Sequence, residues 1–159
     1  MPNEIKDKFS SAAALTITLA SLGSSSTAGR QSTLVDNSTT RYQKLLIYVK
    51  LTLGTSPTGN KAAYVYLIRG DGAATHRSDG AGASDAAWPA STVAINAQLI
   101  GTMVDRSSPA TGDVIYGEFL VDNPGPEWGI GILHDTGVAL NATAGNHHVR
   151  WVGLNPEVQ

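Results

Sequence analysis

The segment "YQKLLIYVKLTLG", Tyr42–Gly54, decides the fold class of this 159-residue chain. Apolar residues alternate along it with mixed ones, which is the two-residue period of a β-strand that buries one face. The segment therefore predicts a long strand of a half-buried sheet. Its predicted buried face consists of Leu45, Ile47, Val49, Leu51 and Leu53, and its opposite face of Leu46, Tyr48, Lys50 and Thr52.

Other segments with strand-like composition lie on both sides of this strand. Pro57 and Gly59 mark a turn, so the strand at 42–54 and the strand at 62–70 are predicted to form a hairpin. Closely spaced strands without a long helix predict an all-β fold, an antiparallel β-sandwich of jelly-roll type with about eight strands. The further predicted strands cover residues 15–19, 31–36, 62–70, 97–104, 113–122, 128–135, 137–140 and 147–154.

The chain divides into an N-terminal arm and one domain. Residues 1–13 are polar and mixed, and we expect an extended arm or a short helix that reaches a neighbouring molecule. Residues 14–159 are long enough to bury one core, so a single β-sandwich domain is predicted. Within it, residues 71–91 are rich in Gly, Ala, Ser and Asp and predict a long loop.

Composition excludes several classes of function. Charged residues make up 15% of the chain, against an ordinary value of about 25%, and such a surface is easily buried against other subunits. A net charge of −2 gives no basic field for nucleic acid, and the absence of cysteine excludes disulfides. The first 23 residues match neither a signal peptide nor a membrane span. We therefore expect a protein made in a cytoplasm, in which the sequons at Asn37 and Asn141 stay unglycosylated.

The triplet Arg69-Gly70-Asp71 has three possible meanings: an adhesion signal, the start of a calcium loop, or a turn after a strand. Glycine permits positive φ and aspartate bonds its own backbone nearby, so a turn is expected. The calcium hypothesis uses Asp71, Asp79 and Asp85, because calcium prefers several oxygen ligands. Their spacing does not match an EF-hand, so a solvated loop is expected instead.

The histidines do not predict a metal site. His147 and His148 are neighbours, and neighbours on a strand point to opposite faces. His76 and His134 lie in other segments without metal-ligand spacing.

A hydrolase would need two carboxylates facing a cleft. Glu118 and Glu127 are the candidates, with Asp113 and Asp122 flanking the same strand as Glu118. The sequence contains neither a nucleophile elbow nor a phosphate-binding loop. We therefore predict no catalytic, cofactor-binding or metal-binding residues, and no enzyme activity.

Aromatic residues leave two alternatives open. Exposed aromatic side chains would favour carbohydrate binding, whereas buried ones would belong to the core or a subunit interface. We expect the core or interface role. The residues concerned are Trp88, Trp128, Trp151, Tyr64 and Tyr66.

Two stretches together resemble a known protein family. They are "AGRQSTLVDNSTTRYQKLLIYVKLTLG", Ala28–Gly54, and "PEWGIGILHDTGVALNATAGNHHVRWVGL", Pro126–Leu154. Both resemble small jelly-roll structural proteins in the virions of tailed bacteriophages. The shared pattern includes Gly-Arg-Gln-Ser, Val-Asp-Asn-Ser-Thr before a long strand, and Thr-Gly-x-Ala-Leu-x-Ala-Thr-x-Gly-Asn-His near the end.

The resemblance implies a head decoration or cement protein that stabilises the assembled capsid. Its expected partners are the major capsid protein and further copies of itself as a homo-oligomer, with no nucleic acid and no membrane. Its expected location is the virion, assembled in the bacterial host cytoplasm. The alternative is a tail, fibre or glycan-binding module, and a third hypothesis is a small hydrolase that uses Glu118 or Glu127. No catalytic residue is carried over from the family.

Overall fold

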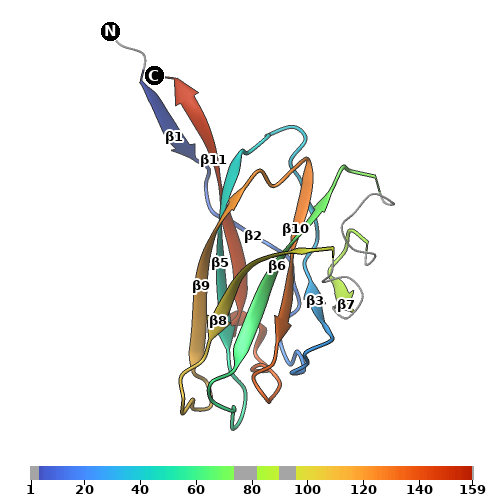
Figure 1. Ribbon diagram of the computed structural model, residues 1–159, viewed down its shortest axis with the longest axis vertical. Coiled ribbons are helices and arrows are strands. Elements are labelled where there is room, and N and C mark those ends of the chain that lie inside the picture. Colours follow the sequence, from blue (N-terminus) through green and yellow to red (C-terminus); the bar gives the residue numbers. More distant parts are fainter. Residues whose placement is uncertain (1–3, 74–81, 90–95, 159) are drawn as a thin grey trace.

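The computed structural model describes residues 4–73, 82–89 and 96–158. Two antiparallel sheets face each other in the manner of a β-sandwich, so the predicted all-β class is confirmed (Figure 1). The helical structure in the described residues is a 3-10 turn, η1 (Ala144–Asn146). No helix in those residues is long and apolar enough to cross a membrane.

The first sheet has the strand order β1-β11-β5-β9, and β2 pairs with β11 beside this path. Its central strand is the segment on which the fold prediction rests, paired with β11 on one side and β9 on the other. The strands are β1 (Ile5–Phe9), β2 (Ala13–Ala14), β5 (Lys44–Thr52), β9 (Val114–Asp122) and β11 (His148–Val158).

The second sheet has the order β7-β3-β10-β6-β8, and β4 pairs with β10 beside this path. The strand β10 lies between β3 and β6 and is buried at seven of its eight positions, because one face packs in the core and the other packs against Trp88. The strands are β3 (Gly29–Gln31), β4 (Val35–Asp36), β6 (Ala62–Gly70), β7 (Ala86–Trp88), β8 (Gln98–Val104) and β10 (Glu127–His134).

The main core lies between the sheets. The predicted inner face of β5 and the residue after it are fully buried, each at 0% exposure. Burying one such side chain contributes about 1.5–3 kcal/mol, so this strand is a large part of the hydrophobic stabilisation. It meets Val65, Leu67, Trp128, Ile130 and Ile132 from the opposite sheet in one cluster.

The predicted hairpin between residues 42–54 and 62–70 is wrong. The strand β5 pairs with β11 and β9, whereas β6 pairs with β10 and β8 in the other sheet. The turn at 56–60 therefore carries the chain across the sandwich. Each of the two strands has an apolar face, and crossing lets these faces cover each other instead of lying side by side in one sheet.

Three other predicted strands differ in the structure. Residues 15–19 keep the predicted alternation, with Leu15 and Leu19 buried, but they form no ladder. Leu15 N–H donates to Val149 O in one sheet, and Thr16 O accepts from Thr33 N–H beside the other. The segment therefore bridges the two sheets.

The predicted strand at 31–36 is divided into β3 and β4. Between them, the Ser32 hydroxyl accepts the Ile130 N–H at 3.0 Å, in place of a backbone carbonyl, and interrupts the ladder. Residues 137–140 supply an isolated bridge, Leu53 with Leu140, instead of a strand.

The segment predicted as a loop at 71–91 contains the strand β7, which pairs with β3. Trp88 at its end is fully buried, and its ring centroid lies 5.1 Å from that of Tyr66. A Cβ on Gly131 would lie 2.9 Å from the Trp88 ring, so glycine is required there for the tryptophan to pack on the sheet. The described part of this segment therefore covers the outer face of the second sheet.

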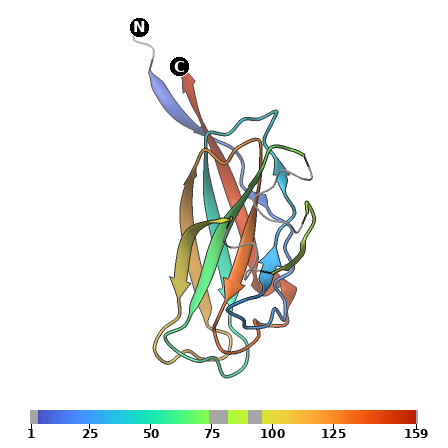
Figure 2. The same ribbon diagram turned by 45° about the vertical axis from the view of Figure 1, so that its right-hand side comes forward.

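The arm is extended and is not a helix in its described residues. The strand β1 pairs with the last five residues of β11, from Ile5 opposite Val158 to Phe9 opposite Leu154. All five β1 side chains are exposed. We name residues 4–9 with 154–158 the terminal ribbon, and it projects beyond both sheets in Figures 1 and 2.

Candidate functional site

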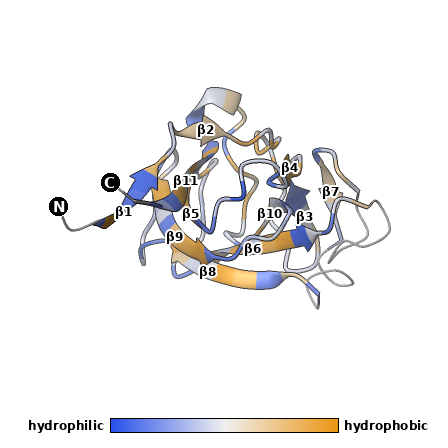
Figure 3. Cartoon of the chain, turned by 90° about the horizontal axis from the view of Figure 1, so that it is seen from above, coloured by the Kyte–Doolittle hydropathy of each residue, from blue (hydrophilic) through white to orange (hydrophobic). Residues whose placement is uncertain are grey.

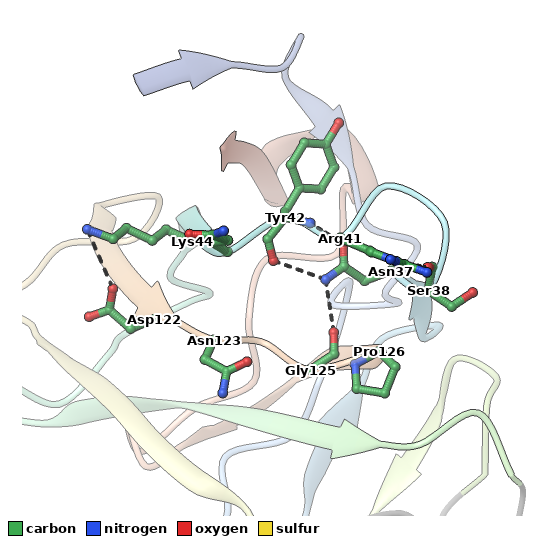
Figure 4. Close-up of a pocket in the computed structure, with 10 residues that line it drawn as sticks. Asn37, Ser38, Arg41, Tyr42, Lys44, Asp122, Asn123, Gly125 and Pro126 are labelled. Atoms are coloured by element: carbon green, nitrogen blue, oxygen red, sulfur yellow. Dashed lines mark hydrogen bonds and ion pairs between the residues drawn. The ribbon is translucent and has the colours of Figure 1, made fainter. Parts of the chain in front are cut away.

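A pocket of about 760 Å³ opens between two loops at the end of the sandwich where the terminal ribbon begins (Figures 1 and 4). One loop joins β4 to β5 and the other joins β9 to β10. The turn residues at 123–126 and the Asp-Asn-Ser-Thr motif were the sequence signals at these positions, but neither pointed to a pocket. Its lining comprises Asn37, Ser38, Arg41, Tyr42, Gln43, Lys44, Asp122, Asn123, Gly125 and Pro126.

Asn37 holds the two walls of this pocket together (Figure 4). Its side chain is 5% exposed, and its Nδ2 donates to Tyr42 O at 3.1 Å and to Gly125 O at 2.9 Å. Its Oδ1 accepts the Tyr42 N–H at 2.8 Å, and its own N–H donates to Pro126 O at 2.7 Å. One buried amide thus fixes both loops before any ligand arrives.

The exposed side chains of the pocket are rich in donors. Arg41 donates from Nε to Ser38 O at 3.1 Å, and Lys44 Nζ lies 3.9 Å from Asp122 Oδ1. Asp122 is the one carboxylate among the described lining residues, so these residues hold no acid–base pair for hydrolysis. The arrangement favours binding of an anionic or hydroxyl-rich group.

The Arg69-Gly70-Asp71 triplet is a strand end and a turn. Arg69 lies in β6, and its guanidinium donates to Asn123 O at 3.2 Å and to Asp122 O at 3.3 Å. Asp71 Oδ1 accepts the Ala73 N–H at 2.9 Å. The arginine therefore supports the second wall of the pocket.

Asp85 joins three segments of the chain. Its carboxylate accepts hydrogen bonds from Arg30 in β3 and from Thr18 in the segment that bridges the two sheets. Burial alone raises the pKa of Asp85, but these hydrogen bonds outweigh it and hold the pKa below its ordinary value. Asp79 and His76 lie outside the described residues, and the residues that are described contain no group of three potential metal ligands.

Two histidines are buried structural groups. His134 is fully buried, with Nδ1 3.0 Å from Thr136 Oγ1 and Nε2 3.0 Å from Leu22 O. His147 accepts the Thr52 N–H at Nδ1 and lies 2.8 Å from Asn141 O through Nε2. Each ring therefore ties separate segments together.

The candidate carboxylates are not brought together. Glu118 lies exposed on β9 in the first sheet, whereas Glu127 begins β10 in the second. Asp113 accepts two bonds from Arg106, at 2.8 and 2.7 Å, and one from the Ala110 N–H. Nothing in this arrangement resembles a pair of carboxylates across a cleft.

The candidate aromatic residues do not form an exposed platform. Trp88 and Trp128 are fully buried, and Trp151 packs edge-on against Trp128 with centroids 5.1 Å apart. Tyr64 and Tyr66 pack partly buried against the Trp88 cluster. The expected core role is therefore what the structure shows for these residues.

Exposed apolar side chains mark two surfaces, neither of which was predicted. In the part of the chain that the structure describes, the large exposed ones fall on the terminal ribbon and on the edge strands β8 and β9. Figure 3 shows β8 and β9 side by side, with hydrophobic residues in both strands. We name β8 and β9 with their exposed side chains the β8–β9 flank. The apolar residues on both faces of "VIYGEFLVD", residues 114–122, were the sequence signal for the β9 half of the flank. The residues are Ile5 and Phe9 on the ribbon, and Leu99, Val104, Val114, Tyr116 and Leu120 on the flank.

Comparison with known proteins found no matching family model, no matching curated protein and no matching solved structure.

Proposed function

We propose that this chain is a structural protein of a tailed-bacteriophage virion, and that it binds and stabilises the assembled head as a decoration or cement protein. The observation that carries the proposal is the terminal ribbon, which holds Ile5 at 73% and Phe9 at 59% exposure outside the sandwich. The sequence resemblance at 28–54 and 126–154 supports the assignment to a phage virion. It also supports a sandwich of jelly-roll type.

The ribbon suits a role in assembly for a physical reason. A two-stranded ribbon is marginally stable alone, and exposed apolar side chains gain about 25 cal/mol per Å² when a partner removes them from water. On a head surface with many equivalent sites, modest contacts of this kind occur in every copy and shift the shell toward its assembled state by mass action. The major capsid protein is the proposed partner.

A second candidate function is glycan binding by a tail or fibre module. The donor-rich pocket favours it, because Arg41, Lys44 and Asn123 line a space large enough for a sugar unit. Acidic or hydroxyl-rich sugars are the ligands that these donors fit.

The test uses expanded heads of the encoding phage prepared without this chain. We expect the full chain to sediment with the heads and to raise the temperature at which they release DNA. The variant Ile5→Ser/Phe9→Ser is expected to bind at least about tenfold more weakly, as is usual when apolar anchors are removed.

The matched control is Arg41→Ser/Gln43→Ser, which alters exposed residues of the pocket and is expected to bind heads normally. Failure of the full chain to bind heads would overturn the head assignment. Binding of acidic sugars that is lost in the pocket variant would favour the second candidate.

A further inference from the structure

A second pocket lies beside the loop at 105–113, which joins β8 to β9 at the end of the sandwich opposite the terminal ribbon (Figures 1 and 2). Its volume of about 400 Å³ is near the lower end of the range for small-molecule sites. The loop is tied to the turn at 56–60, where the Asn60 N–H donates to Arg106 O at 3.3 Å. We name it the Asp105 pocket, and its walls include Val104, Asp105, Arg106, Asp113, Val114 and Tyr116.

Asp105 is a buried acid in the wall of this pocket, with 5% of its surface exposed. Its N–H donates to Lys61 O at 3.0 Å, and its Oδ1 accepts the Lys61 N–H at 2.7 Å. Its Oδ2 is buried and has no hydrogen-bond partner among the described residues. A buried carboxylate oxygen without a partner costs free energy, so the fold uses one oxygen of this side chain and leaves the other uncompensated.

The cations nearest in sequence to Asp105 are bound to other acids. Arg106 donates to Asp113 Oδ2 from Nε at 2.8 Å and from Nη2 at 2.7 Å. The side chain of Lys61 turns to Asp135, with 3.8 Å between Nζ and Oδ2. Among the described residues that line the pocket, two carboxylates therefore face one guanidinium, which leaves one negative charge in excess.

The walls of the pocket favour an organic cation over a metal ion. Hard metal ions take several oxygen ligands, and the described residues contain no group of three potential metal ligands. An ammonium group needs fewer partners, because each of its N–H bonds can use a single acceptor. Val104 and Val114 are 64% and 50% exposed, and they offer apolar surface to the methylene stem that carries such a group.

We propose that the Asp105 pocket binds an alkylammonium group, with Asp105 as its counter-ion and Val104 and Val114 against its stem. Because Oδ2 is buried, the group enters as a neighbouring side chain moves, and the ring of Tyr116 is 57% exposed and can rotate toward solvent. A lysine side chain of another protein and a free aliphatic diamine both carry this group. The proposal does not depend on the assignment to phage heads.

The test is an NMR titration of the isotope-labelled full chain at about pH 7, where alkylamines are charged. The probes are Nα-acetyl-lysine N-methylamide, which represents a protein lysine, and 1,4-diaminobutane, which represents a free diamine. We expect the backbone resonances of residues 104–106 and 113–116 to shift and to saturate, with a dissociation constant of about 1 mM. The probe that binds more tightly identifies the source of the group.

The chemistry of the probe is checked by removing its charge. Acetylation of Nε in the lysine probe keeps the stem but leaves no ammonium, and this probe is expected to cause no saturable shift. Equal binding of the acetylated probe would overturn the proposal, because the pocket would then recognise only the stem.

The variant Asp105→Asn checks the counter-ion. It keeps an acceptor for the Lys61 N–H but removes the charge, so we expect binding at least about tenfold weaker and no decrease in melting temperature. Glu118→Gln removes an exposed acid of β9 outside the pocket, and this matched control is expected to bind as the unaltered chain does. A role of Asp105 confined to folding predicts the reverse, with a lower melting temperature and unchanged binding.

A second variant supplies the ammonium from the chain itself. Val114→Lys introduces one at the wall of the pocket, and it is expected to raise the melting temperature and to block the lysine probe. The rise is expected to disappear in Val114→Lys/Asp105→Asn, because the counter-ion is gone. A Val114→Lys chain that binds the probe normally and gains no stability would contradict the assignment of this pocket.

The proposal is overturned if neither amine causes a saturable shift up to about 50 mM, or if Asp105→Asn binds as tightly as the unaltered chain. Calcium chloride that causes the same shifts and displaces the probes would also overturn it, in favour of a metal site. None of these measurements uses phage heads, so this site and the head assignment can fail separately.

Discussion

Asn37 connects the two loops that form the walls of the pocket. Its amide makes two hydrogen bonds to Tyr42 within the loop before β5 and one to Gly125 in the loop before β10. The resemblance drew attention to the motif around it, but a sequence motif cannot show that the asparagine points inward. That orientation depends on Gly125 and Pro126, which lie far away in the chain and meet Asn37 only after folding.

We expect Asn37→Ala to lower the free energy of unfolding by about 2 kcal/mol, because buried backbone groups lose their partners. Asn37→Asp is expected to cost more, since its second oxygen would face the carbonyls of Tyr42 and Gly125. Urea unfolding measures both effects. Ser38→Ala alters an exposed neighbour in the same loop and serves as the control. Equal stability of all three variants would contradict the role of Asn37 as a clamp.

The folded protein is expected to lose stability in acid because of the buried side chain of His134. Burial lowers the pKa of His134 below its ordinary value, and its bond to the Leu22 carbonyl and the charge of Asp135 only partly oppose this, while His147 acts in the same direction as burial. The unfolded chain therefore binds more protons than the folded one just below the ordinary pKa of about 6.5. The stabilisation is complete above that pH and is lost as the pH falls toward the lowered pKa.

We expect the melting temperature to decrease between about pH 7.5 and pH 5 by more in the unaltered chain than in His134→Gln, which cannot titrate. Calorimetry at a series of pH values measures the difference. His148→Gln provides a comparison, because the pKa of His148 is also lowered, first by burial and then by Lys50 and Arg150. The same pH dependence in His134→Gln would assign the acid sensitivity to other groups.

At the scale of elements, alternation predicted where strands lie but not which strands pair. The range predicted at 62–70 is that of β6, and the buried face of β5 follows the predicted pattern. The predicted hairpin between them was wrong. The same turn residues occur where a chain reverses within one sheet and where it crosses to the opposite sheet, so they do not show which of the two happens. Pairing is decided by which apolar faces cover each other across the core, and no local pattern contains that information.

Short strands escaped prediction for a related reason. The strand β7 is three residues long, "AAW", and without its partner β3 it has no recognisable period. Trp88 was assigned a core or interface role, but its place on the outer face of the second sheet depends on Gly131, a residue in another strand.

We expect Trp88→Ala to lower the free energy of unfolding by about 3–5 kcal/mol, the usual cost of removing a large buried side chain. The loss should also release β7 from the sheet and speed proteolysis near it. Urea unfolding and limited proteolysis measure the two effects. Ala87→Ser changes the exposed neighbour in the same strand and should leave both unchanged. A loss below about 1 kcal/mol would show that Trp88 is not an anchor.

At the scale of the whole molecule, the sandwich and the terminal ribbon are expected to be energetically separate. Every β1 side chain is exposed, and β1 pairs only with β11 among the described strands. An N-terminal arm was expected from the sequence, but its pairing with residues 154–158, the pocket and the flank were not, because each is formed by segments from distant parts of the chain.

We expect a chain that lacks residues 1–9 to unfold with a free energy within about 1 kcal/mol of the full chain, since β1 has no buried side chain and adds little stability. Urea unfolding measures this, and assembly is measured in the same preparations. A large loss of stability would mean that β1 belongs to the folding unit. Retained assembly would mean that contacts elsewhere join the molecules.

The ribbon also has a mechanical consequence. Hydrogen bonds in an antiparallel pair run perpendicular to the strands. If a neighbour grips β1 and the surface beneath the sandwich expands, the pull runs along β1 and loads all of its bonds to β11 at once, in shear. If the two strand ends at Ile5 and Val158 are pulled apart instead, the same hydrogen bonds break one after another, starting from that end. A ribbon held in this way would be strong along its length and weak at its tip, so it would resist stretching and come apart by peeling.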